Sequence, residues 1–230
     1  MPCFNEAARL DFSRLPLARP DVWFVFVNDG SNDRTADCVR EHASDRVLLC
    51  DLERNVGKGE AIRQGFVFAG RAGLLDRSRW FGYWDADFST PLTELDEFFA
   101  FARLYDFDSV DAILGSRVLR LGSAIRRSAL RHYLGRAFMT IVDQSFGLGC
   151  YDTQCGAKLF RTGVADQAFG EPFVSRWIFD VEVLLRLRGR HIVEYPLRAW
   201  TDVDGGTLSI TSELVPTLRD LVRIRQRYRT

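Results

Sequence analysis

The stretch RWFGYWDADFSTP, residues 79–91, combines the features that decide the fold: an apolar strand, a polar strand end and a helix start. The first half is short and rich in aromatic residues, which predicts a buried strand. Asp85 and Asp87 follow at its carboxyl end, where a period of two directs both carboxylates the same way. Thr90 and Pro91 then supply the cap and first-turn residue of a helix.

The same order of strand and helix recurs along the first half of the chain. Short β-branched or aromatic runs, each ended by turn residues, alternate with segments of helical spacing. The expected strands are 22–27, 46–53, 79–87 and 111–117, and the expected helices are 31–43, 57–72 and 90–105. This alternation predicts an α/β fold with a mostly parallel sheet.

Polar clusters follow all four expected strands. They are NDGS (28–31), ERNVGKG (53–59), DAD (85–87) and GSR (115–117). Ligands of open α/β sheets gather at the carboxyl ends of the strands. Four polar clusters at one edge therefore predict a binding site there.

Size and composition restrict the class of protein. The chain has 230 residues, 47% hydrophobic and 27% charged, which is enough for one well-buried domain. Its 31 basic residues balance its 31 acidic residues, so no overall field favours nucleic acid. Five scattered cysteines without a CxxC pair predict neither a disulfide framework nor a zinc site, and favour a reducing, cytoplasmic compartment. No apolar stretch is long enough to cross a bilayer.

Arginines gather in residues 117–136, a segment without a carboxylate. They are Arg117, Arg120, Arg126, Arg127, Arg131 and Arg136. Such a cluster suits an anionic ligand or lipid headgroups. Charge alone leaves this interpretation and that of a solvated face equally open.

The strand-end residues point to phosphate chemistry. Asp85 and Asp87 repel each other at neutral pH, and a hard cation such as Mg²⁺, which binds carboxylates together with substrate phosphates, would remove that repulsion. Lys58, between Gly57 and Gly59 at a helix start, suits an anion. The sequence contains neither GxxxxGK[ST] nor GxGxxG, which argues against a P-loop and a dinucleotide fold.

Taken in order, the motifs PCFNEAARL, VNDGSNDRT, NVGKGEAIRQGF, WDADFSTP and GSR resemble those of family 2 GT-A glycosyltransferases. The later segments YDTQCGAKLF, RWIFDVEVLLRLR and EYPLRAWTDVDGGTLSI are similar to the dolichyl-phosphate β-glucosyltransferase branch. The resemblance covers nearly the whole chain. It implies one GT-A domain over 1–230, with a nucleotide-sugar-binding half (1–115) and an acceptor-binding half (116–230).

The resemblance also implies an activity. A sugar, with glucose favoured, would pass with inversion from a UDP-sugar to a polyprenyl or dolichyl monophosphate, in glycan or glycoprotein biosynthesis. The enzyme would need Mg²⁺ or Mn²⁺, would bind no nucleic acid, and would sit peripherally at the cytoplasmic face of a membrane.

Site residues follow from the resemblance, position by position. Those that would line the nucleotide sugar are Pro2, Phe4, Glu6, Asp29, Lys58 and Asp85. Asp85 and Asp87 would hold the metal. The residues that would bind the acceptor phosphate are Arg117, Arg126, Arg127 and Arg131. Asp87, Arg117, Asp152 and Asp180 are the candidate catalytic residues, with Asp152 or Asp180 as the base if one acts.

Two features leave alternatives open. Members of the family have an apolar strand directly before the PCFNE loop, and here Met1 stands where that strand should end, so the first strand is expected to be missing. A non-catalytic or truncated nucleotide-sugar-binding module is therefore one alternative. A haloacid-dehalogenase-type phosphatase is another, because DADFS partly resembles its DxDx[TV] strand, although Ser89 is off that pattern.

Overall fold

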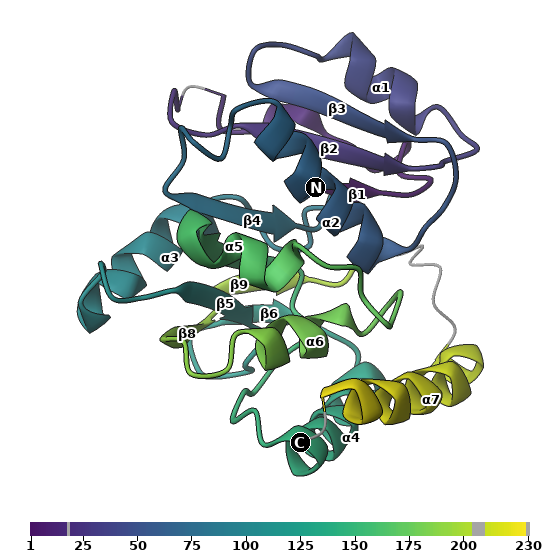
Figure 1. The fold of residues 1–230 in the computed structure, drawn as a ribbon, viewed down its shortest axis with the longest axis vertical. Coiled ribbons are helices and arrows are strands. Elements are labelled where there is room, and N and C mark those ends of the chain that lie inside the picture. Colours follow the sequence, from purple (N-terminus) through teal and green to yellow (C-terminus); the bar gives the residue numbers. More distant parts are fainter. Residues whose placement is uncertain (18, 204–209, 229–230) are drawn as a thin grey trace.

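The computed structural model describes residues 1–17, 19–203 and 210–228. Within these ranges it has nine strands in three sheets (Figure 1). The strands are β1 (Pro2–Cys3), β2 (Phe24–Asp29), β3 (Val47–Leu52), β4 (Trp80–Trp84), β5 (Ala112–Ser116), β6 (Ala124–Arg126), β7 (Ala157–Arg161), β8 (Ile192–Pro196) and β9 (Ala199–Thr201). The helices are α1 (Thr35–Glu41), α2 (Lys58–Arg71), α3 (Glu94–Ala102), α4 (Ala129–Phe146), α5 (Thr162–Phe169), α6 (Phe179–Arg186) and α7 (Ile210–Tyr228), with 3-10 turns at Phe12–Arg14 and Arg103–Tyr105.

Parallel pairing predominates, as the sequence predicts. The first sheet has the order β1-β2-β3 and is parallel throughout. The second has the order β4-β7-β5-β8, in which β5 and β8 are parallel, and β6 and β9 form a parallel ribbon of two strands. The exception is β7, which runs antiparallel to both β4 and β5. It brings a segment of the second half of the chain between two strands of the first.

Helices cover both faces of the second sheet. On one face, side chains of α2, α5 and α6 pack around Phe160 and Phe169, which are fully buried. On the other face, α3 inserts Phe98 against Trp84 and Tyr195. Burying an aromatic side chain of this size contributes about 1.5–3 kcal/mol, so these contacts hold the strand ends in position.

The turn after β4 departs from the expected strand. The strand ends at Trp84, and Phe88 adopts a left-handed conformation with φ of 53°. The Asp85 amide still donates to the Gly156 carbonyl (2.9 Å), and the Phe88 amide returns to the Asp85 carbonyl (3.3 Å). Asp85 and Asp87 therefore lie in a tight turn, and the turn rather than strand periodicity sets their directions.

The expectation of a missing first strand needs correction. Pro2 and Cys3 form the short strand β1, which pairs with Val27 and Asn28 of β2. The ladder continues one step further, since the Met1 amino group donates to the Val25 carbonyl (2.7 Å). These bonds hold the PCFNE loop beside the end of β2.

Candidate active site

Lys58 and Asp85 form the centre of the polar edge. The Lys58 ammonium lies 2.6 Å from Asp85 Oδ1, and both side chains are partly exposed. Lys58 is the first residue of α2, where the preceding Gly57 has a φ of 96° that other residues rarely adopt. Burial opposes the charge on Lys58, but the carboxylates of Asp85 and Asp180 raise its pKa above the ordinary value. Lys58 is therefore a cation at neutral pH.

Asp87 lies among other carboxyl groups. Asp87 Oδ1 accepts a hydrogen bond from the Ser89 amide (2.9 Å), while burial and then the charge of Asp85 raise its pKa. Glu6 adds a third carboxyl group: burial, opposed by Arg9 and reinforced by Asp87 and Asp85, raises its pKa to about 7. Its buried Oε2 has no hydrogen-bond partner among the described residues.

The residues present fit a divalent cation. Across residues 1–17, 19–203 and 210–228, no group of three or more His, Cys, Asp or Glu side chains forms a complete metal site. Asp85 and Asp87 supply two carboxylates, which is the number that Mg²⁺ takes from protein when phosphate oxygens and water complete its shell. Asp85 and Asp87 together carry more negative charge than Lys58 carries positive charge, and such an ion would neutralise the excess.

The PCFNE loop is pinned to the turn after β2. The Asn5 amide donates to Ser31 Oγ (2.9 Å), and the Glu6 amide donates to Thr35 Oγ1 (2.8 Å). Phe4 lies half-buried in this loop, after Pro2 of β1. Ser31 and Thr35 were not among the predicted site residues, although the motif VNDGSNDRT contains both.

The Asp29 carboxylate accepts hydrogen bonds from backbone amides. Its two carboxylate oxygens accept hydrogen bonds from the amides of Val56 (2.7 Å) and Gly57 (3.0 Å), and the side chain is buried. Asp29 thereby shapes the loop that delivers Lys58. Its contact with a base or ribose stays a prediction.

Arg117 and Asp152 form a buried ion pair. The Arg117 Nε and Nη2 atoms bind the two Asp152 oxygens at 2.7 and 2.8 Å, and its amide donates to Oδ2 at 3.1 Å. Burial opposes ionisation of Asp152, yet Arg117 lowers its pKa well below the ordinary value. A carboxylate held in this way is a weak base, so the contacts of Asp152 favour a positioning role.

Asp180 lies in a second buried network, behind Lys58. Its Oδ1 accepts from the Lys158 ammonium (2.5 Å) and from the Tyr83 hydroxyl, and Lys158 also donates to the Cys155 carbonyl. Lys158, at 1% exposure, and Asp180 neutralise each other inside the protein. Tyr83, which the sequence did not single out, joins β4 to α6 through this bond.

A short chain of contacts links the aspartate turn to the arginine segment. The Thr201 amide of β9 donates to the Ser89 carbonyl (2.9 Å), and Thr201 is the register partner of Arg126 in β6. The Arg126 side chain is exposed. Arg127 packs against Gly135 of α4, while the side chain of Arg131 lies outside the described part of the chain. The backbone of Arg126 is thus linked through Thr201 to Ser89, two residues after Asp87.

The loop before α6 passes over the helix start. Arg176 Nη2 donates to Asn55 Oδ1 (2.5 Å), and the Gly59 amide donates to the Arg176 carbonyl (3.2 Å). The Trp177 ring lies 5.9 Å from the Lys58 ammonium. Glu182, at 0% exposure, holds the loop from below through the Val174 and Ser175 amides, and Tyr228 of α7 donates to it at 3.3 Å.

Comparison with known proteins identifies the family. Residues 1–169 match the model described as glycosyl transferase family 2. The chain belongs to glycosyl transferase family 2. It is therefore a glycosyltransferase, as the sequence motifs predict.

Within family 2, the curated relatives of this chain share one name. The chain is 31% identical to the dolichyl-phosphate beta-glucosyltransferase of Dictyostelium discoideum, over 99% of this chain and 73% of that protein. It is 33% identical to the Drosophila melanogaster enzyme of the same name, over 99% and 74%. For the Homo sapiens enzyme the identity is 32%, over 90% of this chain and 64% of that one.

Solved structures support the fold. Glucosyl-3-phosphoglycerate synthase from Mycobacterium tuberculosis with uridine diphosphate gives a TM-score of 0.68 at 12% identity, covering 99% of this chain and 78% of that one. The same enzyme with Mn²⁺, UDP-glucose and glycerol 3-phosphate gives 0.65 at 14% identity, over 99% and 77%. At such identities the likeness concerns the fold alone, and it agrees with the predicted GT-A fold.

Membrane contact was predicted to be peripheral. Among the residues that the structure describes, no helix combines the length and apolarity needed to span a bilayer. The segment GGTLSI (205–210) falls almost entirely outside the described residues.

Proposed function

We propose that this family 2 enzyme transfers glucose, with inversion, from UDP-glucose to a polyprenyl or dolichyl monophosphate. The names of the curated relatives support the acceptor and the sugar. The observation that carries the proposal is the link from the Asp85–Asp87 turn, through Ser89 and Thr201, to Arg126. This link connects the aspartate turn, which is suited to a diphosphate, to the arginine segment, which is suited to a phosphate monoester.

The reaction does not require a strong general base. The bond between the anomeric carbon and the diphosphate oxygen breaks as a lipid phosphate oxygen attacks from the opposite side, and UDP leaves with the electron pair. The attacking oxygen is already anionic, so no proton has to be removed. The ion pair of Asp152 and the buried network of Asp180 support positioning roles for both.

The main requirement of the site is to stabilise the negative charge of the departing diphosphate. Lys58, held as a cation beside Asp85, would attract the departing diphosphate. Asp85 and Asp87 would hold Mg²⁺ or Mn²⁺, which as a Lewis acid supplies further charge stabilisation. Arg126, with Arg127 and Arg131 on the same segment, would orient the lipid phosphate.

A transfer assay tests the proposal directly. Radiolabelled UDP-glucose and a polyprenyl phosphate, with Mn²⁺, should give a product that partitions into organic solvent. In Asp87→Ala, turnover should fall at least about 100-fold, because charge stabilisation by a bound metal is worth several kcal/mol, while the thermal midpoint changes little. UDP-glucose binding without transfer would favour the non-catalytic module, and undiminished turnover in EDTA would contradict the metal role.

We also propose that α4 and the segment before it rest on an anionic membrane surface. The solvent face of α4 carries apolar side chains at helical spacing, including Leu130 (65% exposed), Tyr133 (72%), Leu134 and Ile141. The preceding loop exposes Leu121 completely. Exposed arginines of the same segment, Arg120 and Arg126, complement the apolar side chains with positive charge.

Vesicle sedimentation measures this contact without any transfer reaction. The protein should bind vesicles containing anionic lipid several-fold better than zwitterionic ones, and high salt should weaken binding. Replacement of Leu121 and Tyr133 by Ser should reduce binding several-fold, whereas the matched change of exposed Leu104, on the turn after α3, should not. Equal binding by both variants would contradict the assignment.

A further inference from the structure

Two buried side chains bind most of the backbone amides in the loop that precedes α6. The Glu182 carboxylate accepts hydrogen bonds from the Val174 and Ser175 amides, both at 2.9 Å. The Ser175 hydroxyl oxygen accepts from the Trp177 and Ile178 amides, at 3.2 and 3.0 Å. Glu182 is fully buried and Ser175 is 1% exposed. Because a buried amide without a partner is costly, these two side chains determine the path of the loop.

Both side chains are bonded to α7, which lies beside α4 in Figure 1. Two amides occupy the oxygen of Ser175, so its proton needs a separate acceptor, and Asp220 Oδ2 lies 2.7 Å away. The Tyr228 hydroxyl donates to Glu182 Oε2 (3.3 Å) and accepts from Arg186 Nε (2.8 Å). The loop is therefore connected to α7 at two points.

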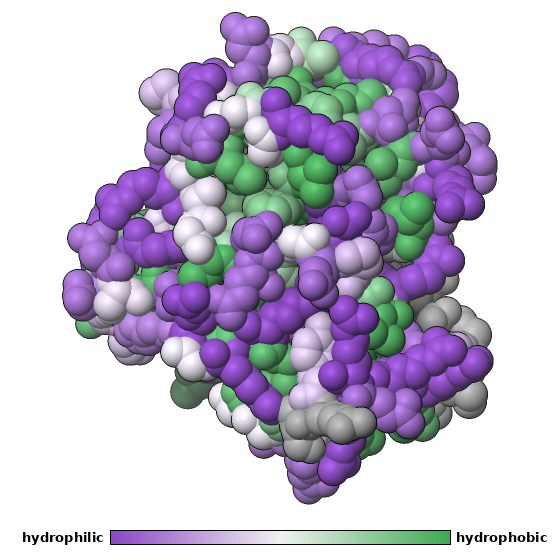
Figure 2. All heavy atoms as spheres, viewed as in Figure 1, coloured by the Kyte–Doolittle hydropathy of each residue, from purple (hydrophilic) through white to green (hydrophobic). Residues whose placement is uncertain are grey.

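The inward side of α7 makes the stronger contacts. Its outer face is polar, as the hydrophilic atoms at the lower right of Figure 2 show, and Arg223 is exposed there. Asp220 lies 3.6 Å from Arg223 Nη1 but 2.7 Å from the buried Ser175 hydroxyl, so the bond to the loop is the stronger of the two. Leu221 and Ile224 pack among side chains of α4 and α6, which holds α7 in place.

The opposite side of the loop contacts the segment that carries Lys58. The Gly59 amide donates to the Arg176 carbonyl (3.2 Å), and Arg176 Nη2 donates to Asn55 Oδ1 (2.5 Å). The Trp177 ring lies 5.9 Å from the Lys58 ammonium. A displacement of the loop would therefore displace the start of α2.

We propose that Asp220 and Tyr228 are positioning residues of the transferase. Through Ser175 and Glu182 they hold the 174–178 loop against the start of α2, so that Lys58 stays in place for the diphosphate of the donor. The use of Lys58 for a diphosphate rests on the proposed function, whereas the connection between α7 and the loop does not. Donor affinity should depend on α7, and acceptor affinity should not, because the arginines proposed for the acceptor phosphate lie in a different segment.

Hydrogen exchange measures the hold of α7 on the loop without any reaction. In the double variant Asp220→Ala, Tyr228→Phe, the Ser175 proton loses its acceptor and Glu182 loses a donor. The amides of residues 174–178 should then exchange at least about tenfold faster, measured by mass spectrometry. Unchanged exchange in this variant would overturn the proposal.

Two single variants serve as matched controls for α7. Asp220→Asn keeps an oxygen that can accept from Ser175, and Arg223→Ala removes only the 3.6 Å ion pair of Asp220. In both, the loop should exchange at the rate of the unmodified protein. Acceleration in Arg223→Ala equal to that in the double variant would contradict the assignment, because that change leaves the bond to Ser175 intact.

Donor affinity measures the positioning role itself. In the double variant, the Kd for UDP with Mn²⁺ by calorimetry and the KM for UDP-glucose should both rise at least about fivefold, while the KM for polyprenyl phosphate stays within about twofold. If the unmodified protein binds UDP but transfers no glucose, the proposed function fails, and the calorimetric comparison still tests the role of α7. Faster loop exchange with unchanged UDP affinity would overturn the positioning role.

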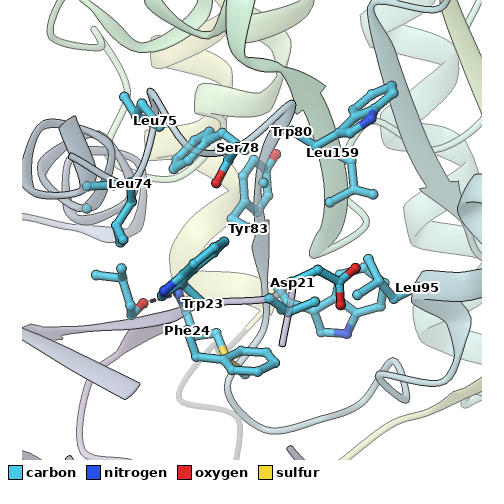
Figure 3. A pocket seen from close by; sticks show the side chains of 18 of the residues that line it. Asp21, Trp23, Phe24, Leu74, Leu75, Ser78, Trp80, Tyr83, Leu95 and Leu159 are labelled. Atoms are coloured by element: carbon cyan, nitrogen blue, oxygen red, sulfur yellow. Dashed lines mark hydrogen bonds between the residues drawn. The ribbon is translucent and has the colours of Figure 1, made fainter. Parts of the chain in front are cut away.

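Leu74→Ala controls for a loss of stability alone. Leu74 is buried and lines a cavity of about 410 Å³ that is bordered by β2, β4, α2 and α3 (Figure 3). Shortening a buried leucine destabilises a protein, so the thermal midpoint should fall. Loop exchange and UDP affinity should stay unchanged. A loss of UDP affinity equal to that of the double variant would indicate general destabilisation and would contradict the positioning role.

Discussion

At the scale of single residues, the position of Asp85 depends on the absence of a side chain at Gly156. A Cβ atom there would lie 1.8 Å from Asp85 Oδ2. Gly156→Ala should therefore displace the carboxylate and reduce transfer at least tenfold, measured as kcat/KM with UDP-glucose. Gly163→Ala is the control, since a Cβ at that position meets nothing within 4 Å. Equal loss in both variants would contradict this prediction.

The sequence predicts some site residues and misses others for physical reasons. Lys58 and Asp85 were both predicted, and they are in contact although the strands that they follow, β3 and β4, belong to different sheets. The pairing of Arg117 with Asp152 could not be predicted, since the residues are far apart in sequence and meet only after β7 is placed. Asp29 was predicted as a ligand contact, but a sequence does not reveal which amides a carboxylate will accept.

At the scale of elements, the Arg117–Asp152 pair joins the end of β5 to the loop before β7. Folding lowers the pKa of Asp152 below its ordinary value of 3.8, so the ionised pair contributes stability above that pH. The contribution declines as the pH falls below that value, because the unfolded carboxylate takes up a proton while the native one stays ionised, and it is lost once the native carboxylate is protonated too.

Asp152→Asn should therefore cost about 3–5 kcal/mol at pH 7, where it leaves a buried guanidinium unpaired. At pH 3 the difference from the unmodified protein should be smaller. Urea unfolding at the two pH values measures it. Should the variant fail to fold, Arg117→Lys keeps the charge, loses the bidentate geometry and should show a smaller cost with the same pH trend. A cost independent of pH would contradict the role of the pair.

Elements with a strong local pattern were predicted within a few residues. The β-branched run of β2 and the amphipathic spacing of α2 are examples, because both are buried on defined faces. The antiparallel strand β7 was not predicted. Its sequence AKLFR is short, and Lys158 within it reads as a loop residue unless the buried partner Asp180 is known.

At the scale of the whole molecule, β7 makes the two predicted halves interdependent. It lies between β4 and β5, although it comes from the half that begins at residue 116. The full chain should therefore unfold in one calorimetric transition, and residues 1–115 alone should show none. Two separate transitions, or a folded fragment with dispersed NMR signals, would contradict the prediction of a single domain.

The contact between Tyr228 and Glu182 connects the end of the last helix to the loop that carries Trp177. A contact made by α7 is therefore connected, through Tyr228 and Glu182, to the loop beside Lys58. Any displacement of α7 would act on Glu182 through Tyr228, and Glu182 binds the Val174 and Ser175 amides just before the Trp177 ring that lies beside Lys58.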